Sequence, residues 1–328
     1  MFRVRVGIIG AGYIGNVHAG ILARDDRVQL TAIYDVDHER AAKLARAHDA
    51  HVAATPAEVI ERCDAVYITT PNTQHVALTL AALDAGKHVF CEKPLATNIE
   101  DAKSVFDRAT NKSAKSLFQV GHNRRFAPVY ATLKQLLSGT HTPHSAHVKM
   151  NRGELLNPVW TGDPSVTGGY LYETPIHMFD MMRFLFGEVE SLVALGSRHE
   201  YKEADDFSVL LKFASGFHAT LATAADASWL FPFERVEVFC HHATLVTREM
   251  ESLIISTNLQ GHFTEQSMQQ LPREEKWGYA QEDRAFIDAI VNHTPPLVTA
   301  FDGLMSVALV HAVYESVESG KAVAIRVC

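Results

Sequence analysis

A short apolar run with three spaced glycines directly after it opens the chain and constrains its fold more than any other feature. Val4–Ile9 has the β-branched content of a buried strand and leads directly into Gly10, Gly12 and Gly15. In this pattern the first glycine permits a tight turn, the second lets the backbone approach a pyrophosphate, and the third lets the next helix pack closely. That helix aims unpaired N–H groups at phosphate. An ordinary strand–helix turn is the alternative, but the segment after Gly15 favours a dinucleotide-binding fold.

A carboxylate stands where such a fold needs one. The next expected strand, Val28–Tyr34, ends at Asp35, which lies 20 residues after Gly15. This spacing suits a carboxylate that accepts hydrogen bonds from the adenosine ribose hydroxyls. A carboxylate there repels a 2′-phosphate, and the next two residues supply no cation to offset it. We therefore expect NAD in preference to NADP, with Arg40 close enough in sequence to keep NADP as the alternative.

Length and charge narrow the class of protein further. A chain of 328 residues exceeds one ordinary core and fits two domains. The formal net charge of −8, without a long Lys/Arg cluster, argues against nucleic acid as a partner. No apolar run approaches the roughly 20 residues that cross a bilayer, and the N-terminus lacks the regions of a secretory signal. We expect a cytoplasmic protein that acts on a small neutral or polar substrate, with no membrane partner.

Cysteines and histidines give no metal or disulfide signal. The four cysteines are far apart and form no CxxC pair, so we interpret them as reduced, mostly buried thiols. Among the 18 histidines, His141, His144 and His147 are expected in a Thr/Pro/Gly-rich loop, over residues 138–145, that leads into a strand. Adjacent His241 and His242 would point to opposite faces if that segment is a strand. Solvated histidines are the better interpretation of both sets, so we expect no metal site.

Up to about residue 120, short strands and helices alternate, which predicts a doubly wound parallel sheet with helices on both faces. The expected strands are Val4–Ile9, Leu30–Tyr34, Ala65–Ile68, His88–Cys91 and Leu117–Val120. The expected helices are Ile14–Ala23, Glu39–His48, Pro56–Arg62, Thr73–Ala85 and Ile99–Thr110. The first domain is therefore placed at residues 1–121.

Beyond residue 121, strand comes after strand, which predicts an α+β domain with a large, mostly antiparallel sheet over residues 122–328. The expected strands are Ala146–Met150, Val189–Ser197, Phe207–Lys212, Phe217–Ala225, Phe233–Cys240, Ala243–Arg248 and Ser252–Ser256. The expected helices are Ala127–Leu137, Tyr172–Phe186, Tyr279–Asn292 and Gly303–Ser319. The last two helices can return to pack on the first domain.

A lysine stands at the carboxyl end of an expected parallel strand. Thr70, Pro71 and Asn72 come after one such strand, and Lys93 comes after another. Ligands of doubly wound sheets bind at this edge. Because Pro94 keeps Lys93 in a loop, its amine can point into a cleft, hydrogen-bond a reacting oxygen and stabilise developing negative charge. An ordinary surface lysine is the alternative.

A carboxylate and an imidazole lie four residues apart in the second domain. Glu173 and His177 would project from the same face of the expected helix Tyr172–Phe186, and Pro175 is tolerable in its first turn. A carboxylate beside an imidazole raises its basicity and fixes its tautomer, which suits a general base. A helix-end histidine capped by its own glutamate is the alternative.

Together these motifs resemble the Gfo/Idh/MocA family of NAD(P)-dependent oxidoreductases over essentially the whole chain. The residues that carry the resemblance are Gly10, Gly12 and Gly15, Thr70–Asn72 with His75, Glu92–Leu95, Gly121–Phe126, and Gly168–Gly169 with Glu173 and His177 after them. It implies that Lys93 and His177 are catalytic, that the second sheet is open, and that homodimers or homotetramers form on it. Glu173 departs from the aspartate of inositol-dehydrogenase-like members, and its extra methylene changes what the carboxylate reaches.

The family resemblance implies a dehydrogenase of a secondary alcohol on a sugar or cyclitol, or a reductase of the matching ketone. Lys93 would hydrogen-bond the hydroxyl, and His177, with Glu173, would take its proton. The cofactor-binding candidates are Gly10, Gly12, Tyr13, Ile14, Gly15, Asp35, Thr70, Pro71, Asn72, His75, Glu92 and Lys93. The substrate-binding candidates are Asn123, Arg124, Arg125, Asn151, Arg152, Trp160, Tyr172, Glu173 and His177. A transient-redox enzyme that cleaves or eliminates glycosides with recycled NAD, and a non-catalytic dinucleotide sensor, remain alternatives.

Overall fold

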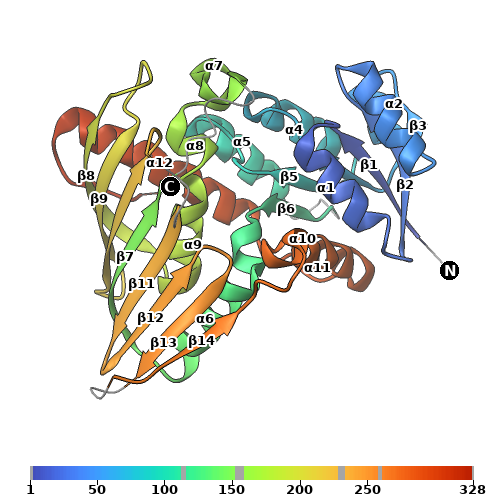
Figure 1. Cartoon of the computed structure of the whole chain (residues 1–328). Coiled ribbons are helices and arrows are strands. Elements are labelled where there is room, and N and C mark those ends of the chain that lie inside the picture. The colour runs from blue at the N-terminus through green and yellow to red at the C-terminus, as the bar shows by residue number, and fades with distance from the viewer. Residues whose placement is uncertain (1–2, 112–115, 152–158, 228–232, 258–260, 327–328) are drawn as a thin grey trace. The chain divides into compact units, whose positions relative to one another are not determined.

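The chain divides into two compact units (Figure 1). The computed structural model describes all residues except 1–2, 112–115, 152–158, 228–232, 258–260 and 327–328. Unit 1 comprises Met1–Asn123 and Tyr279–Leu304, and unit 2 comprises Arg124–Gly278 and Met305–Cys328. The chain therefore enters unit 1 twice, the second time with a helical segment from near the C-terminus.

Unit 1 is built on a six-stranded parallel sheet with the order β3-β2-β1-β4-β5-β6. The strands are β1 (Val4–Ile9), β2 (Val28–Tyr34), β3 (His51–Val52), β4 (Ala65–Ile68), β5 (His88–Glu92) and β6 (Phe118–Gly121). The doubly wound fold expected from the alternating pattern is confirmed, although the two-residue β3 was too short to predict. Because the strand order reverses between β1 and β4, the loops after these two strands flank the usual ligand crevice.

Helices cover this sheet, and their starts depend on local capping chemistry. They are α1 (Tyr13–Leu22), α2 (His38–Ala47), α3 (Pro56–Arg62), η1 (Asn72–Gln74), α4 (His75–Asp84), α5 (Ile99–Ala109) and α11 (Tyr279–Asn292). Thr55 accepts from the Glu58 N–H at the start of α3, where Pro56 occupies the first turn. From the C-terminal segment, α11 packs on α1 and adds Phe286 and Ile287 to the apolar core. This packing makes α11 part of the dinucleotide-fold unit.

Unit 2 is built on a nine-stranded sheet with the order β14-β13-β12-β11-β7-β10-β9-β8-β15. The strands are β7 (Pro143–Met150), β8 (Val189–Ser197), β9 (Asp206–Phe213), β10 (His218–Ala224), β11 (Glu234–Cys240), β12 (Ala243–Arg248), β13 (Ser252–Thr257), β14 (Phe263–Ser267) and β15 (Val323–Ala324). Among the described strands of this sheet, only β7 and β10 pair in parallel, so the expected antiparallel character is confirmed. Burial alternates along β9, and the inner face packs on α6 (Pro128–Gly139), α9 (Ile176–Phe186) and the later part of α12 (Ala300–Ser319).

The expected single helix over Tyr172–Phe186 is wrong. Two helices stand there, α8 (Tyr170–Glu173) and α9, separated by Thr174 and Pro175. Thr174 leaves helical geometry with φ −121° and ψ −59°. Pro175 has no N–H to continue the helical hydrogen bonds, so the chain begins a new helix after it.

The structure also places the histidine sets, and one expectation about them is corrected. His144 lies within β7 and not in a loop, because the strand begins at Pro143. His241 and His242 form the turn between β11 and β12, so the condition of lying in a strand is not met, and their ring centroids lie 4.0 Å apart. Across the described part of the chain, no group of three or more His, Cys, Asp or Glu side chains has a metal-holding arrangement.

Cys63, Cys91 and Cys240 are free and buried, as expected, whereas Cys328 lies outside the described residues. The short elements of unit 2 complete the architecture: η3 (Val159–Gly162), α7 (Pro164–Thr167) and α10 (Arg273–Lys276), with η2 (Asn123–Phe126) at the first crossing between units. In the described ranges, every helix is too short or too polar to span a bilayer.

Candidate active site

Two of the three glycines in the first turn are required by the packing of the chain itself. A Cβ on Gly10 would stand 2.6 Å from the Thr69 carbonyl group, and one on Gly15 would collide with the Gly10 carbonyl oxygen. The Thr69 hydroxyl donates a 2.7 Å hydrogen bond to that same oxygen. The loops after β1 and β4 therefore meet backbone to backbone at the carboxyl edge of the sheet.

Gly12 has a different reason to be glycine. A Cβ built on it would meet nothing within 4 Å, so packing within the described chain does not exclude a side chain there. The Asn16 amide donates to the carbonyl oxygens of Ala11 at 2.9 Å and Gly12 at 2.7 Å, which holds the turn in shape. Open space against an exposed backbone at a helix N-terminus is what a pyrophosphate requires. The turn, which includes the first residues of α1, Tyr13 and Ile14, thus fits a dinucleotide.

Asp35 is tied to the same turn. Its carboxylate accepts from the Ala11 N–H at 2.7 Å and from the Asp37 N–H at 2.8 Å. Asp37 in turn caps α2, and its carboxylate lies 3.1 Å from Nε of Arg40. The guanidinium group that kept NADP as an alternative is therefore paired with Asp37.

His75, expected to bind cofactor, makes structural hydrogen bonds at the carboxyl edge of the parallel sheet. The buried ring places Nδ1 2.7 Å from the Pro94 carbonyl oxygen and Nε2 2.9 Å from the Thr70 carbonyl oxygen. Because both partners are acceptors, both ring nitrogens donate. Burial lowers the pKa of His75, but Cys91 and the two carbonyl groups outweigh burial and raise it to about 9. His75 thereby holds together the loops after β4 and β5.

Those two loops carry the remaining cofactor candidates. Pro71 precedes η1, and Asn72 begins it and is buried. Glu92 ends β5, and its carboxylate accepts from the Lys93 N–H at 3.1 Å. Burial raises the pKa of Glu92. The hydrogen bond from His18 and the positive charge of His18 outweigh burial, so the pKa of Glu92 is lowered. Lys93 itself is half-buried at the carboxyl end of β5.

In unit 2, Glu173 and His177 stand on either side of the break between α8 and α9. Glu173 is the last residue of α8, and His177 lies in the first turn of α9, where its N–H faces the Thr174 carbonyl oxygen at 3.4 Å. Both side chains are buried, at 9% and 8% exposure. The helical spacing rule does not apply across the break, so their placement results from the Thr174–Pro175 geometry.

The two adjacent arginines proposed for a sugar pocket are engaged inside unit 2. Arg124 is fully buried and pairs with Glu234 at 3.0 Å, while Tyr130 donates a 2.6 Å hydrogen bond to the same carboxylate. Arg125 makes two hydrogen bonds to Asp180, at 2.6 and 2.8 Å. These contacts favour a framework role for both guanidinium groups.

The other substrate candidates are scattered. Asn151 comes after β7 and donates its N–H to the Phe233 carbonyl oxygen at 2.7 Å, and the ring of Tyr172 lies 6.4 Å from that of Tyr314. Asn123 is buried where η2 begins. Arg152 and the side chain of Trp160 lie outside the described part of the chain.

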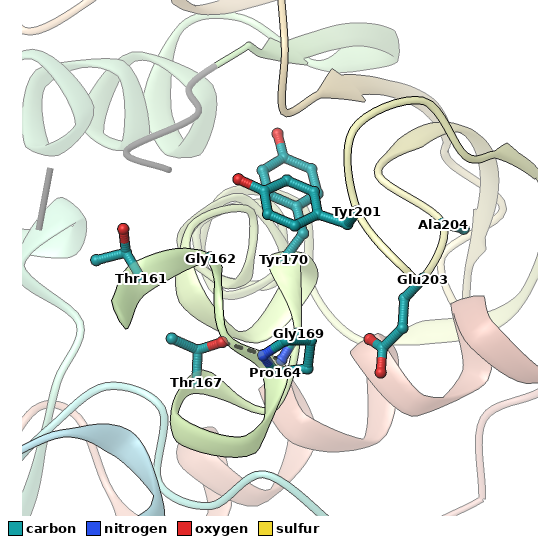
Figure 2. Close-up of a pocket in the computed structure, with 9 residues that line it drawn as sticks. All are labelled: Thr161, Gly162, Pro164, Thr167, Gly169, Tyr170, Tyr201, Glu203 and Ala204. Carbon is teal, nitrogen blue, oxygen red and sulfur yellow. Dashed lines mark hydrogen bonds between the residues drawn. The ribbon is translucent and has the colours of Figure 1, made fainter. Parts of the chain in front are cut away.

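A small hollow in unit 2 lies beside α8 (Figure 2). It is lined by Thr161, Gly162, Pro164, Thr167, Gly169, Tyr170, Tyr201, Glu203 and Ala204. Of the residues that line it, Gly169 donates its N–H to the Thr167 hydroxyl at 3.2 Å, and burial raises the pKa of Glu203. None of the described substrate candidates lines this hollow.

Sequence reasoning missed the acidic partners Asp180, Glu234 and Asp283, which no local pattern marks. It also missed His18, which is fully buried on α1. One signal could have found His18: it lies three residues after Gly15, on the helix face that Gly15, Ala19 and Leu22 bury.

The glycine turn, the Asp35 carboxylate and the strand order are typical of a dinucleotide-binding fold, and a second α+β unit accompanies it. Residues 4–122 match the oxidoreductase family model with an NAD-binding Rossmann fold, and residues 139–325 match its C-terminal alpha/beta domain. The chain belongs to the Gfo/Idh/MocA family and is an NAD-dependent oxidoreductase acting on CH–OH groups.

Full-length relatives carry related names. The chain is 30% identical over 331 residues to the myo-inositol 2-dehydrogenase of Thermotoga maritima, covering 98% of each chain. It is 28% identical over 343 residues to the inositol 2-dehydrogenase of Rhizobium meliloti, covering 98% of this chain and 99% of the relative. A solved levoglucosan dehydrogenase in complex with NADH superposes with a TM-score of 0.89 at 21% identity, over 99% of this chain and 100% of that chain. This last likeness shows the shared fold.

Proposed function

We propose that the protein is an NAD-dependent dehydrogenase that oxidises a secondary alcohol of a sugar or cyclitol, or reduces the matching ketone. The observation that carries the proposal is the carboxyl edge of the parallel sheet, where the glycine turn, Asp35 and Lys93 come after β1, β2 and β5. The Thermotoga maritima and Rhizobium meliloti relatives support the substrate class, since both are inositol dehydrogenases.

The chemistry divides between two side chains. Lys93 hydrogen-bonds the substrate hydroxyl and stabilises the negative charge that develops on its oxygen. His177 takes the hydroxyl proton as the C–O bond becomes a carbonyl, and Glu173 orients the imidazole or binds a neighbouring hydroxyl. Bound NAD supplies the hydride acceptor for the hydrogen on the oxidised carbon.

NAD is the preferred cofactor in this proposal. The Asp35 carboxylate would accept hydrogen bonds from the adenosine ribose and repel a 2′-phosphate. The ion pair between Arg40 and Asp37 supports this, because a guanidinium engaged by a carboxylate offers less to a phosphate. The residue after Asp35, Val36, is an aliphatic side chain with 83% exposure and brings no charge.

Unit 2 is proposed to bind substrate and to form homodimers or homotetramers. The outer face of its sheet exposes three aliphatic side chains, Val193, Leu195 and Leu210, and Val193 is paired with Leu210 across β8 and β9. Exposed aliphatic neighbours on a sheet face are typical of an interface. Sedimentation of the wild type and of Leu195→Glu checks this, and a wild-type monomer would contradict it.

The test is NADH formation across cyclitols, aldoses, amino sugars and uronic acids, with NAD and NADP compared for each. Lys93→Met should abolish turnover while NAD affinity stays within about threefold, since the amine acts on the substrate. Lys87→Met is the matched control, because the Lys87 amine donates to the Cys63 carbonyl oxygen at 2.8 Å in the same unit.

The outcomes separate the alternatives. Turnover retained by Lys93→Met would remove Lys93 from the mechanism. Product formation without net NADH would favour the transient-redox alternative over a dehydrogenase. Tight NAD binding with no conversion of any compound in the panel would favour the sensor alternative and overturn the proposal.

A further inference from the structure

A buried histidine in unit 1 lies between two carboxylates. His18, on α1, places Nδ1 2.8 Å from Oδ1 of Asp283 on α11 and Nε2 3.1 Å from Oε1 of Glu92 at the end of β5. His18 is fully buried, and Asp283 and Glu92 are 1% and 6% exposed. Three charged or polar side chains from distant parts of the sequence thus meet inside the core.

Aromatic rings close the space around His18. The rings of Tyr67 on β4, Phe90 on β5 and Tyr279 on α11 lie 5.5, 4.9 and 6.0 Å from the imidazole. Since each ring nitrogen faces a carboxylate oxygen, each donates, and the imidazole carries two protons. Burial lowers the pKa of His18, but the charges and hydrogen bonds of Asp283 and Glu92 outweigh burial and raise it to about 10.

The second oxygen of Glu92 leads to the reactive loop. Oε2 accepts the backbone N–H of Lys93 at 3.1 Å. On the neighbouring strand, a Cβ on Gly121 would stand 3.1 Å from Cα and Cδ of Glu92 and 3.2 Å from Oε2. Gly121 therefore gives the Glu92 side chain its space, and the carboxylate is held between His18 and the Lys93 backbone.

We propose that His18 is a positioning residue: by holding Glu92 against the Lys93 N–H and Asp283 against α1, it sets where the Lys93 amine stands. The inference deepens the proposed function and rests on Lys93 acting on the substrate. The same contacts connect the helix that begins at the glycine turn with the loop that carries the amine. Neither His18 nor Asp283 touches substrate in this proposal, and both act through Glu92.

His18→Gln tests the proposal. A glutamine side chain carries both of its N–H donors on one nitrogen and has an acceptor oxygen beside it, so it satisfies only one of the two carboxylates. We expect the rate of hydride transfer in a single turnover, at saturating NAD and the best substrate of the panel, to fall about a hundredfold, as expected when a reacting group is misplaced. NAD affinity should stay within about threefold, because the glycine turn and Asp35 are unchanged.

His88→Gln is the matched control. His88 lies at the amino end of the same strand β5, where Nδ1 accepts the Leu117 N–H at 3.0 Å. This variant also removes a structural imidazole, and its hydride transfer should stay within about threefold of wild type. Asp283→Asn should show an intermediate loss, because the Glu92 contact with His18 survives.

Four results would overturn the inference. They are a wild-type rate in folded His18→Gln, a rate loss matched by the control, a loss of NAD affinity as large as the loss of rate, and nitrogen chemical shifts of a neutral His18 in the wild-type protein at pH 8. The last measurement decides the matter if His18→Gln does not fold. These results are distinguishable from failure of the proposed function. If Lys93 does not act on the substrate, Lys93→Met retains turnover, whatever the rate of His18→Gln.

Discussion

The Asp35 carboxylate accepts a 2.7 Å hydrogen bond from the Ala11 N–H, which lies inside the glycine-rich turn. The carboxylate proposed to bind the adenosine ribose is thus hydrogen-bonded to the glycine-rich turn proposed to bind the pyrophosphate. Its second oxygen is engaged by the Asp37 N–H. Cofactor choice and phosphate binding are therefore expected to respond together when Asp35 is changed.

Asp35→Ser should lower kcat/KM for NAD by about 10- to 100-fold, because hydrogen bonds to a charged group are lost. Use of NADP should rise, since the repulsion of its 2′-phosphate is removed. Steady-state kinetics with both cofactors measures the change. Thr55→Ala is the control: it removes the cap of α3 and costs about 1 kcal/mol of stability without altering the NAD/NADP ratio. An unchanged ratio in Asp35→Ser would refute the assignment.

Gly12→Ala should weaken NAD binding without destabilising the fold, whereas Gly15→Ala should destabilise the fold itself. A Cβ at Gly12 meets nothing within 4 Å, so thermal unfolding should change by no more than about 0.5 kcal/mol. NAD affinity should nevertheless fall about tenfold or more, because the methyl group occupies the space of the pyrophosphate. At Gly15 the methyl group meets the Gly10 carbonyl oxygen, so stability itself should fall by about 1–3 kcal/mol. Calorimetric titration and thermal melts distinguish the two, and equal NAD affinity in Gly12→Ala would contradict the cradle.

The stability of the protein should decrease from neutral to alkaline pH. Asp283 and Glu92 raise the pKa of buried His18 from 6.5 to about 10 against the effect of burial. When folding raises the pKa of a histidine, the protonated histidine stabilises the folded state. This stabilisation is complete below the pKa of the unfolded chain and is lost as the pH rises through the pKa of the folded protein. The free energy of unfolding should therefore fall between pH 7 and pH 10, by about 1.4 kcal/mol per pH unit at most for one group.

Urea unfolding at each pH measures this dependence, and His18→Gln should show a flatter curve. His75, whose pKa is raised to about 9, contributes in the same direction in both proteins, so the difference between the two curves isolates His18. Parallel curves would show that His18 does not titrate in this range.

Arg124 is expected to support the fold of unit 2. Arg124→Met leaves the buried Glu234 carboxylate without its ion pair and should cost about 3–5 kcal/mol in urea unfolding. The double variant Arg124→Met/Glu234→Gln should recover part of this loss, because the uncompensated charge is gone. A raised KM with unchanged stability would instead return Arg124 to the substrate pocket.

Glu173→Asp should change the order of preferred substrates. Shortening the side chain by one methylene moves the carboxylate away from its proposed partner, either His177 or a substrate hydroxyl. A hydrogen bond weakens steeply when its geometry is changed in this way. We expect kcat/KM for the best substrate to fall about tenfold, while another compound of the panel gains relative to it. Identical ratios across the panel would show that Glu173 contacts neither substrate nor the base.

Local pattern was sufficient for much of the fold. Val4–Ile9, Ala65–Ile68, Pro56–Arg62 and Tyr279–Asn292 have in the structure the bounds expected from sequence. The two strands are short apolar runs, Pro56–Arg62 begins at a capping threonine, and Tyr279–Asn292 is long enough to show a helical period; each of these signals acts over a few residues. The glycine turn and Asp35 are predictable for the same reason, since their spacing is set within one strand–helix–strand segment.

Where the pattern failed, a single residue overrode it. Pro175 broke a helix whose apolar periodicity runs on past it, because the missing N–H is a backbone property that periodicity does not register. The expectation that Glu173 and His177 share a helix face failed with it.

The sequence by itself determined the doubly wound sheet, the glycine turn and the family, because each is written in residues close together along the chain. Only the tertiary structure decided which charged groups meet. His18 and Asp283 are 265 residues apart, and Arg124 and Glu234 are 110 residues apart. A buried charge needs a partner of opposite charge, and the fold can supply that partner from a distant part of the sequence. No local sequence pattern indicates which carboxylate this partner is.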